Sequence, residues 1–402
     1  MRSLFFFLFV IAAPVAKSQQ GWWQAQLYRE DGNNIVFTFE WKTERGKPVW
    51  YIHNASEKIK VTNIRRTGDS IIVQMPVFES EFRVTYRNKK IEGVWKKGSS
   101  AGIQVIPFTA IPGKDRFAAG NSSSKNISGR WAAFFTDNKT ADTTVAEFNQ
   151  QGNQVTGTFL TASSDYRYLE GVVRNDSLFL STFDGAHAYL FTAKIDNDKK
   201  LSGGMYYAGA KSKEEWTAVK NEKAAVPYDE SAMYLKPGQE RLNFKFNDLE
   251  GNPVSINDER FKNKVVIVQL MGSWCPNCMD ETVFLSEYYN KNKQRGVEIV
   301  SLAYEYSTDI ERSKKSLRKF QQGFNVQYPM LITGVAVTDS LRTEKTLPQL
   351  TPIKTFPSSI IIDKNGKVRK IETTFNGPGT GEHYLEYKKE FEATIDELLK
   401  GN

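Results

Sequence analysis

The chain has 402 residues and a formal net charge of +8, and 40% of its residues are hydrophobic and 25% charged. This length predicts two or three domains, and the composition is typical of a globular protein, which excludes a mainly disordered chain. Lysine and arginine are interspersed with acidic residues, so the sequence lacks the basic footprint of a nucleic-acid-binding protein. Two short basic clusters, 211–223 and 312–319, are expected to be solvent-exposed loop and helix faces.

Residues 1–18 have the pattern of a secretory signal peptide. A positive charge at Arg2 is followed by an apolar run, 4–16, and small residues stand at the expected cleavage site. This run is shorter than the roughly 20 residues that a membrane-spanning helix needs. The sequence therefore predicts an exported, soluble protein without stable membrane insertion.

Residues 19–111 and 128–221 are predicted to form two all-β units. In both, β-branched and aromatic residues alternate with polar ones in short runs that turn residues separate. Each unit has about eight candidate strands, enough for a barrel or a sandwich, and we favour a lipocalin-like barrel. The alternation does not distinguish one barrel per unit from a joint sandwich. In the first unit the candidate strands are 23–28, 35–41, 70–75, 82–86 and 91–95.

The two β-units are predicted to be copies of one unit. Trp23 and Trp131 begin similar runs, and two further pairs of segments match at offsets of about 107 to 110 residues. The matching segments are 68–73 with 175–180 and 91–96 with 201–206. Residues 112–127, rich in Gly, Ser, Asn and Lys, and residues 222–240, which contain two prolines, are predicted to be linkers.

The second unit contains a dense mixture of polar and aromatic residues over 156–171 and near residue 184. This mixture permits a ligand site. Cross-strand aromatic pairs and turn residues are the favoured interpretation, because such pairs are common in sheets. The residues concerned are Tyr166, Arg167, Tyr168, Phe183 and Asp184.

Residues 241–402 hold the only two cysteines of the chain, Cys275 and Cys278. The apolar run 265–271 predicts a strand buried on both faces, and Pro276 suits the first turn of a following helix. Cys275 is therefore expected at a helix N-terminus, where unpaired N–H groups and the helix dipole stabilise a thiolate. Cys278, one turn further on, can resolve a mixed disulfide, so the pattern predicts dithiol exchange through a redox-active Cys275–Cys278 disulfide.

Other uses of the two cysteines are less favoured. A zinc site needs more ligands, and the three histidines, His53, His187 and His383, are remote in sequence. A structural disulfide across two residues would stabilise little. The absence of a histidine near the motif argues against copper handling, and the lack of an isolated cysteine argues against a peroxidase. We expect no metal and no cofactor.

Further elements of residues 241–402 predict an α/β domain. An amphipathic helix is expected over 308–320, a strand over 326–332 and a last helix over 382–399. Together with the strand before the cysteines, these elements predict a central sheet with helices on both faces.

Residues from about 242 to 399 resemble the TlpA/ResA-type thiol-disulfide oxidoreductases of bacterial envelopes, which have the thioredoxin fold. The resemblance rests on the Trp-Cys-Pro-Asn-Cys motif and on several blocks around it. These blocks are 244–254, 264–268, 296–302 and 355–368.

The resemblance also implies roles for particular residues. In the family, the proline of the last block is cis and faces the active-site cysteines, which implies a cis Phe356–Pro357 bond packed against the Cys275 sulfur. The family places an acidic residue three positions after the second cysteine, and here that residue is Glu281. The implied substrate groove consists of Trp274, Pro276, Phe356 and Pro357.

Two interpretations of Glu281 remain open. One turn beyond Cys278, it is expected to be partly buried beneath the site, where its pKa would rise and it could exchange a proton with a cysteine. As an ordinary carboxylate of an early helical turn, it would instead have a lowered pKa. Asp280 would suit that surface role better.

Two functions from different classes follow. The first is an enzyme that reduces disulfides of exported proteins and is returned to the dithiol by a membrane thiol-electron donor. The resemblance implies a location in the periplasm, with cytochrome c biogenesis as one candidate process. The second is a redox-sensitive binding protein whose β-units hold a ligand or partner. The intact motif together with the Phe-Pro block favours the enzyme, while the net direction of exchange and the substrate stay open.

Overall fold

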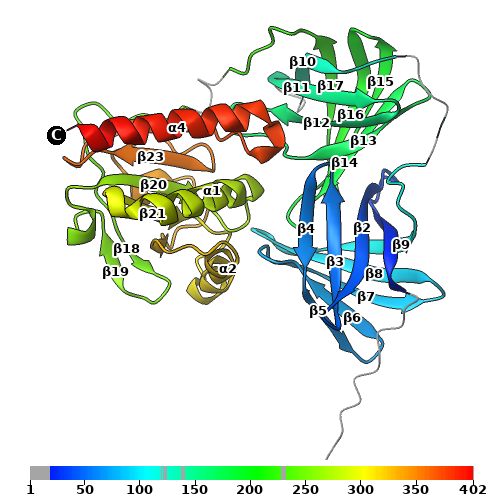
Figure 1. Ribbon diagram of the computed structural model, residues 1–402, viewed down its shortest axis with the longest axis horizontal. Coiled ribbons are helices and arrows are strands. Elements are labelled where there is room, and N and C mark those ends of the chain that lie inside the picture. The colour runs from blue at the N-terminus through cyan, green and yellow to red at the C-terminus, as the bar shows by residue number, and fades with distance from the viewer. Residues whose placement is uncertain (1–18, 119, 121–124, 137–140, 228–231, 402) are drawn as a thin grey trace, which may run out of the picture.

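The computed structural model describes residues 19–118, 120, 125–136, 141–227 and 232–401. The predicted signal peptide, 1–18, lies outside the described residues. Three sheets form the framework, namely a nine-stranded sheet, a closed eight-stranded barrel and a seven-stranded sheet that carries the helices (Figure 1). The predicted fold class, two all-β units followed by an α/β domain, is confirmed.

The first β-unit is an antiparallel sheet in the order β4-β3-β2-β1-β9-β8-β7-β6-β5. β4 and β5 stand at opposite ends of this order, yet only Thr62 separates them in sequence. The two edges therefore lie beside each other at this residue, and the sheet is nearly closed. The strands are β1 (Gly21–Leu27), β2 (Ile35–Glu44), β3 (Lys47–Asn54), β4 (Glu57–Val61), β5 (Asn63–Thr67), β6 (Ser70–Gln74), β7 (Ser80–Arg87), β8 (Lys90–Ser99) and β9 (Gly102–Pro112).

The second β-unit is a closed barrel whose strands follow one another in chain order, with β10 pairing with β17. The barrel that we favoured is thus confirmed for this unit. Aromatic rings pack inside it, such as those of Phe159 and Phe191, whose centroids lie 4.8 Å apart. The strands are β10 (Gly129–Thr136), β11 (Ala141–Gln151), β12 (Gln154–Leu160), β13 (Leu169–Arg174), β14 (Ser177–Phe183), β15 (Ala188–Asn197), β16 (Lys200–Ala208) and β17 (Ser212–Lys220).

Matching hydrogen bonds support the predicted duplication. Trp23 in β1 and Trp131 in β10 are both buried. Each indole Nε1 donates to the backbone oxygen four residues earlier, to Gln19 at 3.0 Å and to Ile127 at 2.8 Å. The first strand of each unit is therefore anchored in the same way.

The two β-units pack against each other. Phe183 of β14 stacks on Phe37 of β2 with a centroid distance of 4.3 Å. Arg116, from the segment predicted as a linker, is buried and donates to the carbonyl oxygen of Ser181 at 3.0 Å. The segment between the units thus contributes to the contact between them.

The α/β domain is built on a mixed sheet in the order β19-β18-β22-β21-β20-β23-β24, in which β20, β21 and β22 are parallel. Its strands are β18 (Lys245–Asp248), β19 (Pro253–Ser255), β20 (Val265–Met271), β21 (Val297–Ala303), β22 (Met330–Ile332), β23 (Ser358–Ile362) and β24 (Val368–Glu372). Its α-helices are α1 (Pro276–Asn292), α2 (Ile310–Gly323), α3 (Arg342–Thr346) and α4 (Glu382–Lys400).

The central strand β20 is buried on both faces, as predicted. Val265 and Ile267 face a core that α1, α2 and α4 complete. Val266 and Val268 face the opposite core, beside the chain that follows α3. Helices therefore lie on both faces, but the three long ones share one face.

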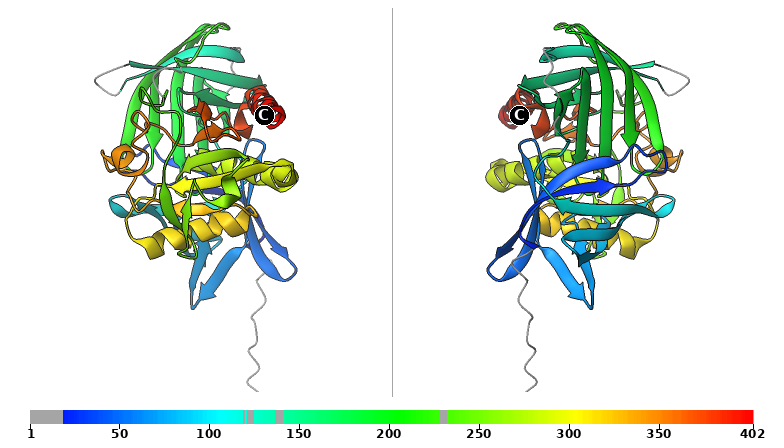
Figure 2. Two further views of the ribbon diagram at one scale, coloured as in Figure 1. Left: turned by 90° about the vertical axis from the view of Figure 1, so that its left-hand side faces the viewer. Right: turned by 90° about the vertical axis from the view of Figure 1, so that its right-hand side faces the viewer.

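The α/β domain lies across the junction of the two β-units, as the side views show (Figure 2). The first residues of α1 point toward the β-units (Figure 1). In the described part of the chain, no helix is both long and apolar enough to cross a membrane.

Candidate functional site

The two cysteines lie where β20 passes into α1. Cys275 is the N-cap of α1, and Pro276 is the first helical residue. The backbone N–H of Cys278 donates to Cys275 Sγ at 3.1 Å, so the sulfur accepts one of the amide groups that the first turn leaves unpaired. The two residues form a disulfide, and the structure therefore shows the oxidised state. The predicted position of Cys275 at a helix N-terminus is confirmed.

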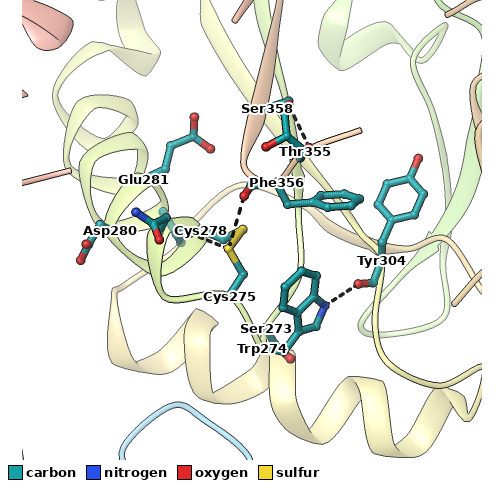
Figure 3. The surroundings of a disulfide bond; sticks show 12 residues. Ser273, Trp274, Cys275, Cys278, Asp280, Glu281, Tyr304, Thr355, Phe356 and Ser358 are labelled. Carbon is teal, nitrogen blue, oxygen red and sulfur yellow. Dashed lines mark hydrogen bonds between the residues drawn. A yellow bond between two sulfur atoms is a disulfide. The ribbon is translucent and has the colours of Figure 1, made fainter. Parts of the chain in front are cut away.

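The segment before β23 faces the disulfide (Figure 3). The Phe356–Pro357 peptide is cis, as predicted. Cys275 Sγ lies 3.7 Å from the carbonyl oxygen of Phe356, so a reduced thiol at Cys275 can donate a hydrogen bond to this oxygen.

The remaining residues of the predicted substrate groove lie beside the disulfide. The Trp274 ring meets the Phe356 ring edge-on at a centroid distance of 6.0 Å, and its Nε1 donates to the carbonyl oxygen of Tyr304 at 2.8 Å. Trp274 and Phe356 are half-buried, whereas Pro276 and Pro357 are buried. The structure brings the four residues together, and their role in substrate binding stays a prediction.

Glu281 lies on α1 one turn after Cys278 and faces the sheet. The strand register places Ser301, Gln269 and Ser359 side by side on β21, β20 and β23. Gln269 Nε2 and Ser359 Oγ each donate to a different carboxylate oxygen of Glu281 at 2.9 Å. A polar row within three apolar strands therefore holds this carboxyl group.

Burial dominates the electrostatics of Glu281. The side chain is 1% exposed, and desolvation raises its pKa to about 7, although the hydrogen bonds from Gln269 and Ser359 act in the opposite direction. The lowered pKa expected of an ordinary early-helix carboxylate is therefore wrong. Near neutral pH the group can gain or lose a proton.

Glu305 is a second buried carboxyl group beside the motif, and our sequence analysis did not identify it. It follows β21 and accepts hydrogen bonds from the backbone N–H and the hydroxyl of Ser273 at 2.8 and 2.5 Å. Burial raises its pKa to about 7, while the bonds from Ser273 act to lower it. The available sequence signal was an acidic residue two positions after the end of a strand, β21.

The expected surface role of Asp280 is wrong. Asp280 is buried, and Arg167 donates to its two carboxylate oxygens from Nε at 2.7 Å and Nη2 at 2.9 Å. Arg167 also binds Asp184 at 3.2 Å and Glu57 at 2.7 Å. We call Glu57, Arg167, Asp184 and Asp280 the interface ion cluster. The start of the outward face of α1 is covered by the second β-unit, which the helical pattern of α1 does not reveal.

The interface ion cluster joins all three parts of the chain. Asp280 belongs to α1, Glu57 to β4 of the first unit, and Arg167 to a loop of the barrel. Burial alone would lower the pKa of Arg167, but the carboxylates around it hold the pKa above its ordinary value. Arg167, interpreted from sequence as a turn residue, thus binds across domain boundaries, and Asp184 holds it from within the barrel unit.

The β-units also pack against the helical turn that carries the disulfide. Asn277 Nδ2 in α1 donates to the carbonyl oxygen of Asp165 in the barrel loop at 3.1 Å. Val77 and Phe78 of the first unit and Ala186 of the second join the same apolar cluster as both cysteines. Cys275 itself is only 5% exposed. A protein disulfide therefore reaches Cys275 only if the residues packed around it move.

Comparisons with known proteins identify the family. The Redoxin family matches residues 236–386. The thiol-disulfide oxidoreductase ResA of Bacillus thuringiensis subsp. konkukian (strain 97-27) is 31% identical over 155 residues, which are 39% of this chain and 78% of that protein. The chain belongs to the ResA family of thiol-disulfide oxidoreductases.

Other ResA proteins and solved structures are also similar. ResA of Bacillus subtilis (strain 168) is 25% identical over 139 residues, which are 35% of this chain and 68% of that protein. A thiol:disulfide interchange protein of the thioredoxin family from Chlorobium tepidum TLS is 19% identical, over 40% of this chain and 96% of that chain, with a TM-score of 0.30.

Membership of the ResA family confirms that this chain is an oxidoreductase enzyme with a thioredoxin-like domain. The Redoxin match begins at residue 236, after β17, so both β-units precede the part of the chain that matches this family. Among the described residues, no group of three or more His, Cys, Asp or Glu side chains is arranged to hold a metal ion.

Proposed function

We propose that this ResA-family protein reduces disulfides of exported proteins in the bacterial periplasm. The observation that carries the proposal is the position of Cys275 as the N-cap of α1, where Sγ accepts the N–H of Cys278. Amide donors and the positive end of the helix dipole favour a thiolate at this position. A membrane thiol-electron donor is the proposed source of electrons.

The reaction has two steps. The Cys275 thiolate attacks one sulfur of the partner's disulfide, forms a mixed disulfide and releases the other sulfur as a thiolate. Cys278 then attacks Cys275 Sγ, which re-forms the Cys275–Cys278 disulfide and frees the second partner sulfur. The partner gains two electrons and two protons, and the thiol-electron donor returns two electrons to the cysteines.

The two cysteines are expected to differ in what they trap. Cys275→Ala should abolish exchange with a protein disulfide, whereas Cys278→Ala should accumulate a mixed disulfide through Cys275. Non-reducing gels and mass spectrometry of the linked peptide would show this. A partner attached to Cys278 in the Cys275→Ala protein would contradict the assignment of the nucleophile.

The net direction of exchange is tested by the reduction potential. A reductase should have a potential near that of thioredoxin, about −270 mV, rather than near the roughly −120 mV of a strong oxidant. Equilibration of the purified protein with glutathione buffers would measure this value. A potential at the oxidising end would refute the reductase assignment and leave exchange itself intact.

Glu281 is proposed to exchange a proton with the cysteines during the reaction. Its pKa of about 7 allows both protonation states near neutral pH. Titration of the Cys275 thiolate in the wild type and in Glu281→Gln, together with exchange rates, tests this role. Unchanged thiol pKa values and rates would exclude it.

A further inference from the structure

A groove of about 280 Å³ runs between the first β-unit and the α/β domain. Strands β7, β8 and β9 form one wall and α2 forms the other. The groove is rich in cationic side chains, and we call it the basic groove. These side chains are Arg83, Lys96, Lys97, Arg312, Lys315 and Lys319.

Only part of this positive charge is neutralised within the protein. The groove contains two acidic residues, Glu79 and Glu81, which pair with Arg312 at 2.7 Å and with Arg83 at 2.5 Å. Lys319 donates to the carbonyl oxygen of Phe78 at 3.1 Å. Among the described residues, no carboxylate forms an ion pair with any of the four lysines of the groove. The basic groove therefore has four lysines that are not held in an ion pair, and within the described part of the chain the side chains of Lys96 and Lys315 make no hydrogen bond either.

The lysines lie close enough to influence one another. Burial lowers the pKa of Lys319, and the neighbouring Lys315 lowers it further. Burial also lowers the pKa of Lys97. Because like charges in a partly desolvated site destabilise one another, an incoming anion would relieve repulsion as well as form new bonds.

The groove also offers an apolar contact. Ile103 of β9 lines it and is 71% exposed. An exposed aliphatic side chain beside lysines suits a polypeptide that carries both carboxylates and an apolar residue. A small inorganic anion would leave Ile103 unused.

The basic groove leads toward the dithiol. It adjoins a recess of about 20 Å³ that is lined by Ser273, Trp274 and Glu305. The Arg312–Glu79 ion pair lines both spaces and stands between them. A recess of this size has room for about one water molecule, so a cysteine side chain enters only when the two walls separate.

We propose that the basic groove binds an acidic polypeptide segment adjacent to the cysteine whose disulfide is reduced at Cys275. This inference rests on the proposed function and specifies its substrate class. Carboxylates of the segment bind Lys96 and Lys315 on opposite walls of the groove. A further carboxylate of the segment competes with Glu79 for Arg312. This competition weakens the Arg312–Glu79 ion pair that separates the groove from the recess at Trp274.

The test compares peptides of equal length that contain one intramolecular disulfide with acidic or neutral flanking residues. Single-turnover reduction of each peptide by the pre-reduced protein is followed at low ionic strength. The groove variant is Lys96→Glu/Lys315→Glu. Its matched control is Lys90→Glu/Lys314→Glu, which makes the same change of charge on the same strand and helix outside the groove.

With the wild type and the control, the acidic peptide should react about tenfold faster than the neutral one, and added salt should remove the difference. The groove variant should lose this preference and reduce the neutral peptide at the wild-type rate. Equal rates for both peptides with the wild type would overturn the proposal. An equal loss of the preference for the acidic peptide in both variants would also overturn it, because the preference would then come from the overall charge of the protein and not from the groove. Failure of the wild type to reduce any peptide would refute the proposed function itself.

Discussion

Glu281 and Asp280 are neighbours on α1, but they belong to two different regions of the molecule. Glu281 faces the core of the α/β domain, where neutral donors from Gln269 and Ser359 surround it. Asp280 faces the barrel and binds Arg167, which lies 113 residues earlier in the chain. In the core, the buried carboxyl group of Glu281 is stabilised in its protonated form. At the domain boundary, the buried carboxyl group of Asp280 is stabilised by the cation of Arg167.

The difference has consequences for both stability and pH dependence. A buried carboxyl group without a neighbouring cation has its lower free energy when it is protonated. The stability of the region around Glu281 should therefore depend on pH near neutrality. In the interface ion cluster, burial raises the pKa of Asp280 while Arg167 acts to lower it, and the stability of the cluster depends on the β-units and the α/β domain remaining together. Substitutions in the two regions should therefore differ in size and in pH dependence.

The largest effect is expected for Arg167→Ala. This change leaves the carboxylates of Asp280, Asp184 and Glu57 buried without their cation, and breaking a buried ion pair costs about 3–5 kcal/mol. Urea denaturation should show this loss in the free energy of unfolding. Alkylation of Cys275 in the reduced protein should also become faster, because the packing of the barrel unit against the first turn of α1 is loosened.

Arg87→Ala is the matched control for this prediction. It removes an arginine from an ion pair with Asp69 in which the two side chains are 72% and 84% exposed. Little change in stability is expected, because water screens such a pair. If Arg167→Ala were as mild as Arg87→Ala, the interface ion cluster would not hold the domains together.

The second largest effect concerns the pH dependence of stability at Glu281. Its pKa is about 7 in the folded protein against an ordinary 4.5, so the folded state binds a proton that the unfolded state has released. The contribution of Glu281 to the free energy of unfolding should therefore fall as pH rises from 4.5 to 7, by about 3 kcal/mol at about 1.4 kcal/mol per pH unit. Glu281→Gln should remove this contribution, as denaturation at pH 5 and pH 8 would show.

Glu287→Gln provides a control on the exposed side of the same helix. Glu287 is exposed, so this change should leave the wild-type pH dependence intact. If the wild type and Glu281→Gln lost the same stability between pH 5 and pH 8, Glu281 would be ionised across the whole range, and the comparison with Asp280 would fail.

The core region could be predicted from the sequence to a large extent. The spacing of Cys275, Cys278 and Glu281 places them on successive turns of one helix, and this local geometry depends on few other residues. The partners of Glu281 also left a signal, because Gln269 interrupts an otherwise apolar strand. The cis bond before Pro357 was found through family resemblance, since local patterning alone does not specify it.

The domain boundary could not be predicted in the same way. Helical periodicity places Asp280 on another face of α1 than Glu281, which is why a surface role was expected for it. It does not show what covers the outer face of the helix. Arg167 lies in a loop of a separate unit, and no period or motif links it to Asp280. Contacts between separately folded units depend on how their surfaces fit, which a single sequence does not display.

The smallest effect is expected at the Arg312–Glu79 pair. Like Arg167 and Asp280, these residues join a β-unit to the α/β domain, but their side chains are 30% and 45% exposed. A double-mutant cycle with Arg312→Gln and Glu79→Gln should give a coupling energy of about 0.5 kcal/mol. This energy should decline in 1 M NaCl, where the screening length is only about 3 Å.

The same cycle with Arg167 and Asp280 should give a larger coupling energy that changes little with salt, because water and ions do not reach the buried pair. The two cycles compare the same pair of chemical groups at different depths of one boundary. If the Arg312–Glu79 coupling equalled that of the buried pair, or resisted salt equally, burial would not be what distinguishes them. The stabilisation by the interface ion cluster would then have to come from the number of charged groups in it and not from their burial.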